Sequence, residues 1–322
     1  MSVPSVQVSD NAILKPVPAG AHATLGSTLA AKPDQPSRAN GSIGRPLPGF
    51  ALPEAAHAEA GQLDAPMNDA WFASFGSSVS RVLSSGRAVG ADGVTSRMVQ
   101  ESVMGADDRQ QVTNTAADPF RWVCELTIHA SNGTLWSGTG WLAAPNLVVT
   151  AGHCVFMKNQ GGWATSVVIR PARNGNNAPY EFTSTLALSV AGWVDDQQPA
   201  NDYGALVLSN NDAAMGLGYY GYATLADSEI NRQLINVLGY PIDKQRGTMW
   251  GHARMLSSAT PDELIYLNDT YGGMSGCPVV KWDGQDFQVV GIHNYGDLAG
   301  NRATRITAEV FQNIGAWAQL RD

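Results

Sequence analysis

Cysteine is scarce in this sequence. Only three occur in 322 residues, and they are Cys124, Cys154 and Cys277. Their spacing fits no zinc-binding motif, and an odd count leaves at least one thiol without a partner in the same chain. One disulfide is allowed, but the sequence does not identify its two members. Cysteine usage therefore says little about the redox state of the compartment in which the protein works.

Long apolar runs and clusters of positive charge are also lacking. No stretch approaches the roughly 20 apolar residues of a transmembrane helix, so no membrane span is predicted. The first residues, MSVPSVQVSDNAILKPVPAG, have neither the basic start nor the apolar core of a typical signal peptide. The net charge is −8 and no Lys/Arg-rich run occurs. The sequence therefore predicts no nucleic-acid partner and no binding to anionic membranes.

Turn-forming residues and short β-rich runs are abundant. The chain has 34 glycines and 17 prolines, and 44% of its residues are hydrophobic. From Phe120 onward, apolar runs alternate with turn signals such as Ser131-Asn132-Gly133 and Asp283-Gly284. The runs are RWVCELTI (121–128), NLVVTA (146–151), SVVIR (166–170), LINVLGY (234–240), GCPVV (276–280) and FQVVGI (287–292). Many short strands at this spacing predict an all-β sandwich or barrel.

The two ends of the chain differ from this β-rich part. Residues 1–65 are rich in Ala, Pro, Gly and Ser, a composition that predicts a disordered or loosely packed segment. Within 66–102, apolar residues spaced by three and four predict either one amphipathic helix or, as an equal alternative, a mobile linker. Residues 306–320 place apolar side chains on one helical face, and Thr307 is a suitable N-cap for that helix.

Three short segments, in the order His, Asp, Ser, carry residues suited to nucleophilic catalysis. His153 follows the apolar run VVTAG, and imidazole can shuttle protons because its unperturbed pKa is about 6.5. Asp202, in NDYGAL, could fix the tautomer of that histidine and stabilise its charged form. Ser275, in GGMSGCP, lies in a glycine-rich turn before an apolar run. Each segment alone has a commoner structural explanation, but the three together predict a catalytic triad.

Glycines flank the predicted nucleophile for a chemical reason. Glycine tolerates backbone angles that point two N–H groups at one oxygen, and it leaves room for a substrate. The N–H groups of Gly273 and Ser275 are therefore predicted to form an oxyanion hole. Losing one such donor typically costs about 3–4 kcal/mol of transition-state stabilisation.

These motifs resemble those of the trypsin-like serine proteases, and more closely those of their glutamyl endopeptidase branch. The resemblance spans nearly all of residues 103–322, and its main stretches are GADDRQQVTNT (105–115), GYPIDKQRGTMW (239–250), DTYGGMSGCPV (269–279), GIHNYG (291–296) and NRATRITAEVF (301–311). It implies an all-β, chymotrypsin-like fold of two six-stranded antiparallel barrels with a C-terminal helix. His153 and Asp202 would come from the first barrel and Ser275 from the second. The implied activity is a serine endopeptidase that cleaves after Glu or Asp and needs no metal or cofactor.

The resemblance also implies how the substrate carboxylate is recognised. Thr270, His293 and the α-amino group of a mature N-terminus at Val103 match the residues that bind the substrate carboxylate in this branch. Asp269 falls where trypsin-type enzymes carry the acid that binds Lys or Arg. Because its loop resembles that of glutamyl-specific relatives, we expect the Asp269 carboxylate to point away from the pocket.

A proenzyme is the organisation that the resemblance implies. Residues 1–102 would form the propeptide and 103–322 the protease domain. The sequence of 1–102 itself resembles no known family, and only its position before the protease domain indicates a propeptide. Trypsin-type zymogens switch on when a new α-ammonium pairs with an aspartate just before the serine. Met274 occupies that position here and cannot form the pair, so the freed amine of Val103 is expected to help bind the substrate instead.

Several alternatives stay open from the sequence. Cys154 is where the superfamily commonly has a disulfide; Cys124 could be its partner, or both could be buried free thiols, while Cys277 is expected to be a small packed residue. A trypsin-like or broad specificity, and a non-catalytic binding protein on the same fold, are the alternative functions. The expected protein is a secreted monomer that acts on protein or peptide substrates.

Overall fold

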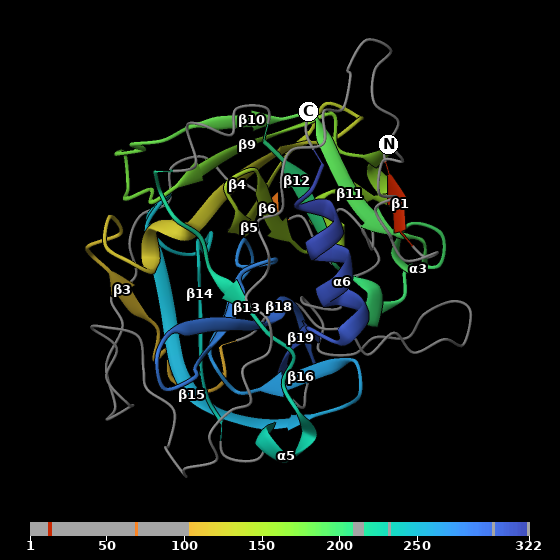
Figure 1. The fold of residues 1–322 in the computed structure, drawn as a ribbon. Helices are drawn as coiled ribbons and strands as arrows, with labels where there is room; N and C mark the ends of the chain where they lie inside the picture. The colour runs from red at the N-terminus through yellow and green to blue at the C-terminus, as the bar shows by residue number, and fades with distance from the viewer. Residues whose placement is uncertain are drawn as a thin grey trace, which may run out of the picture.

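The structure is a computed structural model that describes residues 12–14, 68–69, 103–208, 216–230, 233–297 and 300–320. The helix or linker predicted within 66–102 lies outside these residues, except for a short strand at 68–69. Most of the described chain forms two antiparallel sheets, which lie one above the other in Figure 1. No helix in the described ranges is both long enough and apolar enough to cross a bilayer.

The first sheet is formed by the N-terminal half of the described chain, and we call it the first barrel. Its strand order is β1-β11-β12-β6-β5-β4-β9-β10, with β2 paired to β5. The strands are β1 (Ala12–Leu14), β2 (Asn68–Asp69), β4 (Val123–His129), β5 (Leu135–Ala144), β6 (Leu147–Thr150), β9 (Ser166–Pro171), β10 (Phe182–Ser184), β11 (Leu186–Val190) and β12 (Gly204–Val207). Within the described strands no pairing joins β9 or β10 back to β11, so this barrel stays open.

The second sheet closes on itself, and we call it the second barrel. Six strands form a ring because β18 pairs with both β17 and β19, while β3 and β13 add to its edges. The strands are β3 (Gln110–Val112), β13 (Gly221–Tyr222), β14 (Leu234–Gly239), β15 (Met249–Ala259), β16 (Glu263–Tyr266), β17 (Pro278–Trp282), β18 (Phe287–Asp297) and β19 (Gly300–Arg305). The all-β fold of two barrels predicted from the sequence is therefore confirmed, with one barrel closed and the other half-closed.

The remaining elements are short, apart from the last helix. They are the hairpin β7 (Phe156–Met157) and β8 (Gly162–Trp163), the helices α3 (Ala191–Val194), α5 (Asp227–Ile230) and α6 (Ala308–Trp317), and the 3₁₀ turns η1 (Phe120–Trp122), η2 (Gly152–Cys154), η3 (Lys158–Gln160) and η4 (Pro199–Asn201). The predicted N-cap of α6 is present, because the Thr307 side chain accepts the N–H of Val310.

Local sequence explains both the strands and the turns between them. In β9 buried and half-buried residues alternate, as expected when one face of a strand meets the core. Gly133 ends the turn between β4 and β5 with a φ of +85°, and Gly284 has a φ of +103° between β17 and β18. Only glycine adopts such angles without strain, so the turn signals of the sequence fix where these hairpins reverse.

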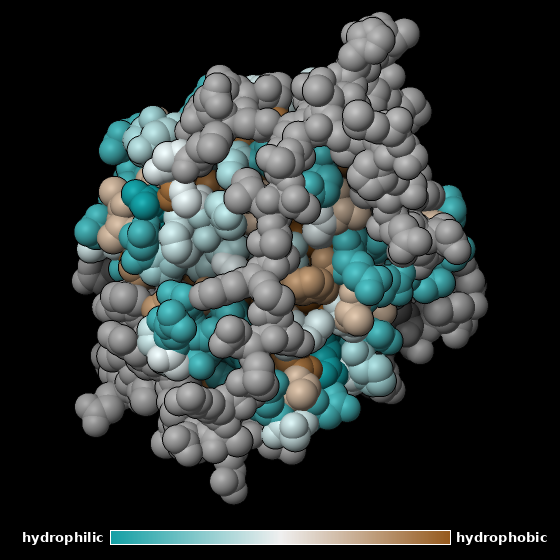
Figure 2. All heavy atoms as spheres, in the orientation of Figure 1, coloured by the Kyte–Doolittle hydropathy of each residue, from teal (hydrophilic) through white to brown (hydrophobic). Residues whose placement is uncertain are grey.

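A shared core joins the two barrels. One apolar cluster includes Trp141 of β5, Leu238 of β14 and Trp317 of α6, all fully buried. The helix α6 lies beside β12 in Figure 1, where the Asn313 side chain donates to the Tyr203 hydroxyl at 2.8 Å. On the face seen in Figure 2 most of the described surface is hydrophilic, with small apolar groups near its middle.

Candidate active site

His153 is presented by the end of β6. The strand runs into η2, whose middle residue is His153, and the side chain is fully buried. The preceding Gly152 has no room for a side chain, because a Cβ would lie 2.8 Å from the Trp193 ring and 3.0 Å from Asp202 Oδ1. The ring of Trp193 also lies edge-on to the His153 ring, with centroids 6.2 Å apart. This packing fixes the position of the imidazole.

Asp202 reaches His153 because β12 pairs with β6. The register places Gly204 opposite Thr150, so the residues just before β12 lie beside those just after β6. Asp202 Oδ1 accepts the backbone N–H of His153 at 2.8 Å, and Oδ2 lies 2.7 Å from His153 Nδ1. Two bonds from one carboxylate hold both the backbone and the ring of the histidine.

The charge of Asp202 also changes the acidity of the ring. Burial by itself lowers the pKa of His153, but the attraction of the neighbouring carboxylate outweighs it, and the pKa lies well above its usual 6.5. The imidazolium form is therefore stabilised by this pair. Such an arrangement suits a base that must hold a proton during a reaction.

Ser275 lies in the loop of residues 267–277 between β16 and β17, which we call the nucleophile loop. Gly273 and Gly276 both have left-handed backbone angles, with φ of +92° and +84°. A Cβ on Gly276 would lie 2.1 Å from Thr150 Oγ1 and 2.3 Å from the Thr139 carbonyl oxygen. Glycine at this position lets the loop of the second barrel press against the first barrel.

Thr139 of β5 holds this contact together. Its N–H donates to the Ser275 carbonyl at 2.8 Å, and its hydroxyl donates to the Gly273 carbonyl at 2.7 Å. The same hydroxyl accepts the N–H of Tyr240 at 3.0 Å. Within the loop, the N–H of Met274 donates to the Tyr271 carbonyl at 3.0 Å. The backbone around Ser275 is therefore fixed from both barrels.

His153 and Asp202 are joined directly, and the Cys154 thiol next to His153 lies 3.7 Å from the Ser275 carbonyl, but the Ser275 hydroxyl forms no hydrogen bond with the His153 ring. Ser275 Oγ donates to the carbonyl of Asn294 at 3.3 Å. His153 Nε2 is buried and has no hydrogen-bond partner in the described part of the chain. Catalytic hydrogen bonds are often long or incomplete without substrate, so the missing bond does not exclude the predicted role of Ser275. The Asn294 side chain also connects to the site, since it donates to Thr304 Oγ1, which lies 3.4 Å from the Asp202 carbonyl.

Thr270 and His293, predicted to bind a carboxylate, are both buried near this loop. Thr270 Oγ1 has no hydrogen-bond partner among the described residues, which is unusual for a buried hydroxyl. His293 Nδ1 lies 2.6 Å from the Tyr266 hydroxyl and 3.1 Å from the Arg302 carbonyl. Burial lowers the pKa of His293 to about 3, so its ring is neutral at neutral pH. The structure does not join these two side chains directly.

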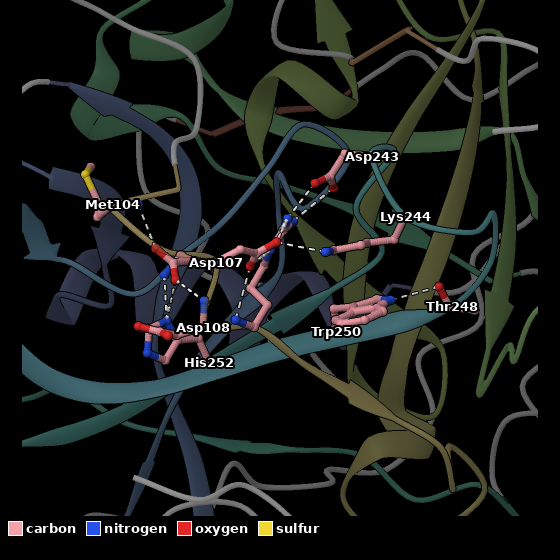
Figure 3. Close-up of polar contacts among 10 residues, drawn as sticks. Met104, Asp107, Asp108, Asp243, Lys244, Thr248, Trp250 and His252 are labelled. Atoms are coloured by element: carbon pink, nitrogen blue, oxygen red, sulfur yellow. Dashed lines mark hydrogen bonds and ion pairs between the residues drawn. The ribbon is translucent and has the colours of Figure 1, made fainter. Parts of the chain in front are cut away.

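Val103, the predicted mature N-terminus, is followed by a segment that meets Asp269. The Asp269 carboxylate accepts the N–H of Met104 at 2.7 Å and the N–H of Asp108 at 2.8 Å. The N–H of Asp269 donates to His252 Nδ1 at 2.9 Å. Figure 3 shows Met104, Asp108 and His252 gathered around this junction. Both carboxylate oxygens are therefore engaged by the chain itself.

Three groups in this cluster have the spacing of metal ligands. Donor atoms of Asp108, His252 and Asp269 lie within 4.8 Å of one another. However, each Asp269 oxygen accepts a backbone N–H and His252 Nδ1 accepts another. These atoms therefore form a hydrogen-bond junction between the strand β15, the loop and the N-terminal segment, while His252 Nε2 is buried without a hydrogen-bond partner among the described residues.

All three cysteines are buried and none forms a disulfide, so Cys124 and Cys154 are not linked. The Cys154 thiol lies 3.7 Å from the Ser275 carbonyl, and burial raises the pKa of Cys124 and of Cys154. Of the two alternatives left by the sequence, the structure has the free thiols.

The sequence did not reveal every residue that shapes this site. Thr139 and Trp193 act through a hydroxyl and a ring contact and lie outside the quoted motifs, and Asn294 lies in GIHNYG but was not singled out because its backbone carbonyl makes the contact. Tyr266 is the clearest omission, because its hydroxyl contacts a histidine that the sequence did single out. A tyrosine in the run LIY gives no signal beyond that of a strand residue.

Comparisons with known proteins agree on one group. A trypsin-like peptidase domain matches residues 138–292. The chain is 38% identical over 220 residues to a Bacillus subtilis (strain 168) protein named extracellular metalloprotease, which covers 67% of this chain and 70% of that one. It is 37% identical over 226 residues to a glutamyl endopeptidase of Bacillus licheniformis, covering 67% and 69%. A solved structure of a Glu endopeptidase in complex with MPD aligns with a TM-score of 0.61 at 25% identity, over 67% of this chain and 99% of that one.

Proposed function

Because this chain belongs to the glutamyl endopeptidase branch of the trypsin-like serine peptidases, we propose that it cleaves peptide bonds after glutamate through an acyl-enzyme on Ser275. The observation that carries the proposal is the two-bond attachment of Asp202 to His153 beside the nucleophile loop. The family makes the chain a serine endopeptidase that acts on proteins. The roles of individual residues, the substrate preference and the processing are what the proposal adds.

In the proposed mechanism, His153 removes the proton of the Ser275 hydroxyl as its oxygen attacks the peptide carbonyl. Asp202 keeps Nδ1 protonated, so that Nε2 faces the serine and can accept the proton. Its charge then stabilises the imidazolium, in keeping with the raised pKa of His153. The imidazolium next protonates the leaving amine, and water hydrolyses the acyl-enzyme.

The N–H groups of Gly273 and Ser275 are the proposed donors to the oxyanion. The left-handed φ of Gly273 supports this role, because it turns the peptide plane within the loop. The contacts of Thr139 support it further, since they fix the carbonyl groups of the same two residues, Gly273 and Ser275. A preformed loop needs little reorganisation when charge develops on the substrate.

Thr270 and His293 are the proposed ligands of the substrate glutamate. The buried Thr270 hydroxyl has no partner among the described residues, and a substrate carboxylate would give it one. The neutral His293 ring can donate one N–H to the same carboxylate. Asp269 does not compete with glutamate in this arrangement, because Met104 and Asp108 occupy its oxygens. The α-amino group of Val103 would add a positive charge.

Processing and location extend the proposal. We infer that residues 1–102 form a propeptide, since the Bacillus subtilis relative matches 67% of this chain and leaves about a third of it unaligned. That relative is named extracellular, and we infer that this chain is also secreted and acts as a monomer. Sequencing the N-terminus of active enzyme from the culture medium tests this; a start well before or after Val103 contradicts it.

The test of specificity compares matched peptides that differ only in Glu, Asp, Arg or Phe before the cleaved bond, with Ser275→Ala as the blank. Glu should give the highest kcat/KM. Thr270→Val should lower kcat/KM for the Glu peptide by about ten- to a hundred-fold, the value of a hydrogen bond to a charged group, and change that for the Phe peptide little. A preference for Arg would overturn the assignment.

The name of the Bacillus subtilis relative makes metal-dependent hydrolysis the second candidate. The cluster of Asp108, His252 and Asp269 is the group whose spacing favours it. Two reagents separate the candidates. A fluorophosphonate should label Ser275 and abolish activity, while EDTA should leave activity in place. Loss with EDTA and no labelling would favour the metal, and a folded protein that is neither labelled nor active would favour a binding protein.

A further inference from the structure

Asp269 is a buried charge that the proposed chemistry does not use. It lies in the nucleophile loop directly before Thr270, and it is fully buried. Its carboxylate accepts two backbone N–H groups, from Met104 and Asp108, which are 165 and 161 residues away in sequence. A buried carboxylate with several N–H donors is stabilised in its ionised form.

His252 supports the carboxylate from β15. Its Nδ1 accepts the N–H of Asp269 at 2.9 Å and lies 3.3 Å from Oδ2. Burial alone raises the pKa of Asp269, but the adjacent His252 ring and the N–H groups of Met104 and Asp108 outweigh it and the pKa is lowered. The group therefore remains an anion, and its orientation is fixed on both sides.

The segment that Asp269 holds is also anchored further along. Arg109, which is almost fully buried, bonds Asp107 at 2.7 Å and contacts Asp243, and Lys244 bonds Asp107 at 2.8 Å. In Figure 3, Asp243 and Lys244 lie on one side of Asp107 and Met104 lies on the other. Residues 110–112 then continue as β3, which pairs with β15. We call residues 103–109 the N-terminal strap.

The strap and the nucleophile loop meet at two places. The anchors at Asp107 and β3 join the strap to residues 243–251, and Arg109 contacts both Asp243 and the face of the Tyr271 ring in the nucleophile loop, 5.7 Å from the ring centroid. The backbone N–H groups of the strap reach the nucleophile loop through the Asp269 carboxylate. A change at Asp269 therefore removes these hydrogen bonds and leaves the other anchors in place.

The geometry points to Asp269 as a positioning residue for substrate recognition: by accepting the N–H groups of Met104 and Asp108, it sets both the start of the strap at Val103 and the adjacent Thr270. This inference rests on the proposed preference for glutamate. In trypsin-type enzymes the acid at this position binds a basic substrate residue directly, whereas Asp269 is inferred to act on the substrate only through the chain segments that it holds. Its partners are peptide N–H groups of the chain itself, and the substrate carboxylate binds next to it.

The test uses enzyme made as the full chain and activated by its own processing, with the new N-terminus checked by mass spectrometry. Asp269→Asn replaces one acceptor oxygen with an NH₂ group, which cannot accept a hydrogen bond from the backbone N–H of Met104 or Asp108. KM for the Glu peptide should rise by about ten-fold or more, the value of a bond to a charged acceptor. The rate of fluorophosphonate labelling and kcat/KM for the Phe peptide should change far less, because neither uses the glutamate site.

A second pair of variants keeps Asp269 and removes one strap donor. Asp108→Pro removes the N–H that bonds Asp269 Oδ2, whereas the matched Asp108→Ala keeps it and removes only the side-chain carboxylate. Asp108→Pro should raise KM for Glu as Asp269→Asn does, and Asp108→Ala should not. This pair decides the matter if Asp269→Asn fails to fold.

Three results would overturn the inference. They are an unchanged KM for Glu in Asp269→Asn or Asp108→Pro, an equal loss for Glu, Phe and the fluorophosphonate, and an Asp108→Ala variant as impaired as Asp108→Pro. The last result would favour side-chain ligands of a cation over backbone donors. A wild-type enzyme without preference for Glu would instead refute the proposed function. Failure of the proposed function is thus seen in the wild-type enzyme, and failure of the role of Asp269 is seen only in the variants.

Discussion

Replacing Gly276 with alanine tests whether the nucleophile loop must touch the first barrel. The φ of this residue is +84°, which costs an L-residue about 1–2 kcal/mol. The new Cβ would also lie 2.1 Å from Thr150 Oγ1, 2.3 Å from the Thr139 oxygen and 2.7 Å from the Ala151 nitrogen. Two of these three atoms belong to backbone, which cannot rotate away, so overpacking adds about 1–3 kcal/mol. The free energy of unfolding should fall by about 2–5 kcal/mol in total.

Gly133→Ala is the matched control for this variant. Gly133 has nearly the same φ, +85°, but nothing lies within 4 Å of its Cβ position. It should lose only the backbone cost of about 1–2 kcal/mol and keep its activity. Urea unfolding gives the stability of both proteins.

Activity separates the two variants most sharply. The loop of Gly276→Ala must move off the first barrel, and a displacement of about 1 Å can cost a hundred-fold in rate. Both kcat/KM for the Glu peptide and the rate of fluorophosphonate labelling should therefore fall for Gly276→Ala alone. If Gly276→Ala matched Gly133→Ala in stability and kept full activity, the contact would have no importance for the site.

Further predictions concern the triad and the thiols. Asp202→Asn should lower kcat by about 10⁴-fold with an unchanged circular dichroism spectrum, because the ring loses the carboxylate that sets its tautomer; a loss below ten-fold would contradict the role. Because the raised pKa of His153 keeps the ring protonated to higher pH, the acid limb of kcat/KM should have its midpoint above 6.5, and a midpoint at or below that value would contradict it. By the same linkage, the pair with Asp202 stabilises the fold fully below the pKa of an unfolded histidine, and this contribution is lost as pH rises through the higher folded pKa. A thiol reagent should find all three cysteines unreactive in the folded protein and reactive after denaturation without reductant; fewer than three would reveal a disulfide.

The sequence was most informative where local chemistry determines structure. The runs ending at Thr150 and beginning at Pro278 are strands because their β-branched residues suit a buried sheet, and the turn at Gly133 is fixed by its backbone angle. Thr307 caps α6 as predicted for the same reason, since the bond is made within one turn. The His153–Asp202 pair could be anticipated because the motifs around both residues are short and each contains its own reactive group, and the role of Ser275 beside them stays a prediction.

Contacts between distant segments could not be predicted in this way. The sequence could not tell that Ser275 Oγ donates to Asn294 or that Thr139 links both barrels, because each bond depends on how two separate strands pack. The direction of the Asp269 carboxylate was expected from resemblance alone, and its actual partners are backbone groups that any residue would offer. The open first barrel likewise depends on strand pairing, which local propensity does not determine.

The position of Thr139 makes catalytic activity depend on how tightly the two barrels pack against each other. Its hydroxyl and N–H form hydrogen bonds across the interface between the barrels, to Gly273, Ser275 and Tyr240. Separation of the two barrels would therefore distort the loop that carries Ser275, while each sheet can remain intact. We therefore expect that low concentrations of denaturant abolish peptide hydrolysis before the circular dichroism signal of the β-sheets is lost. Removing the denaturant promptly should restore full activity.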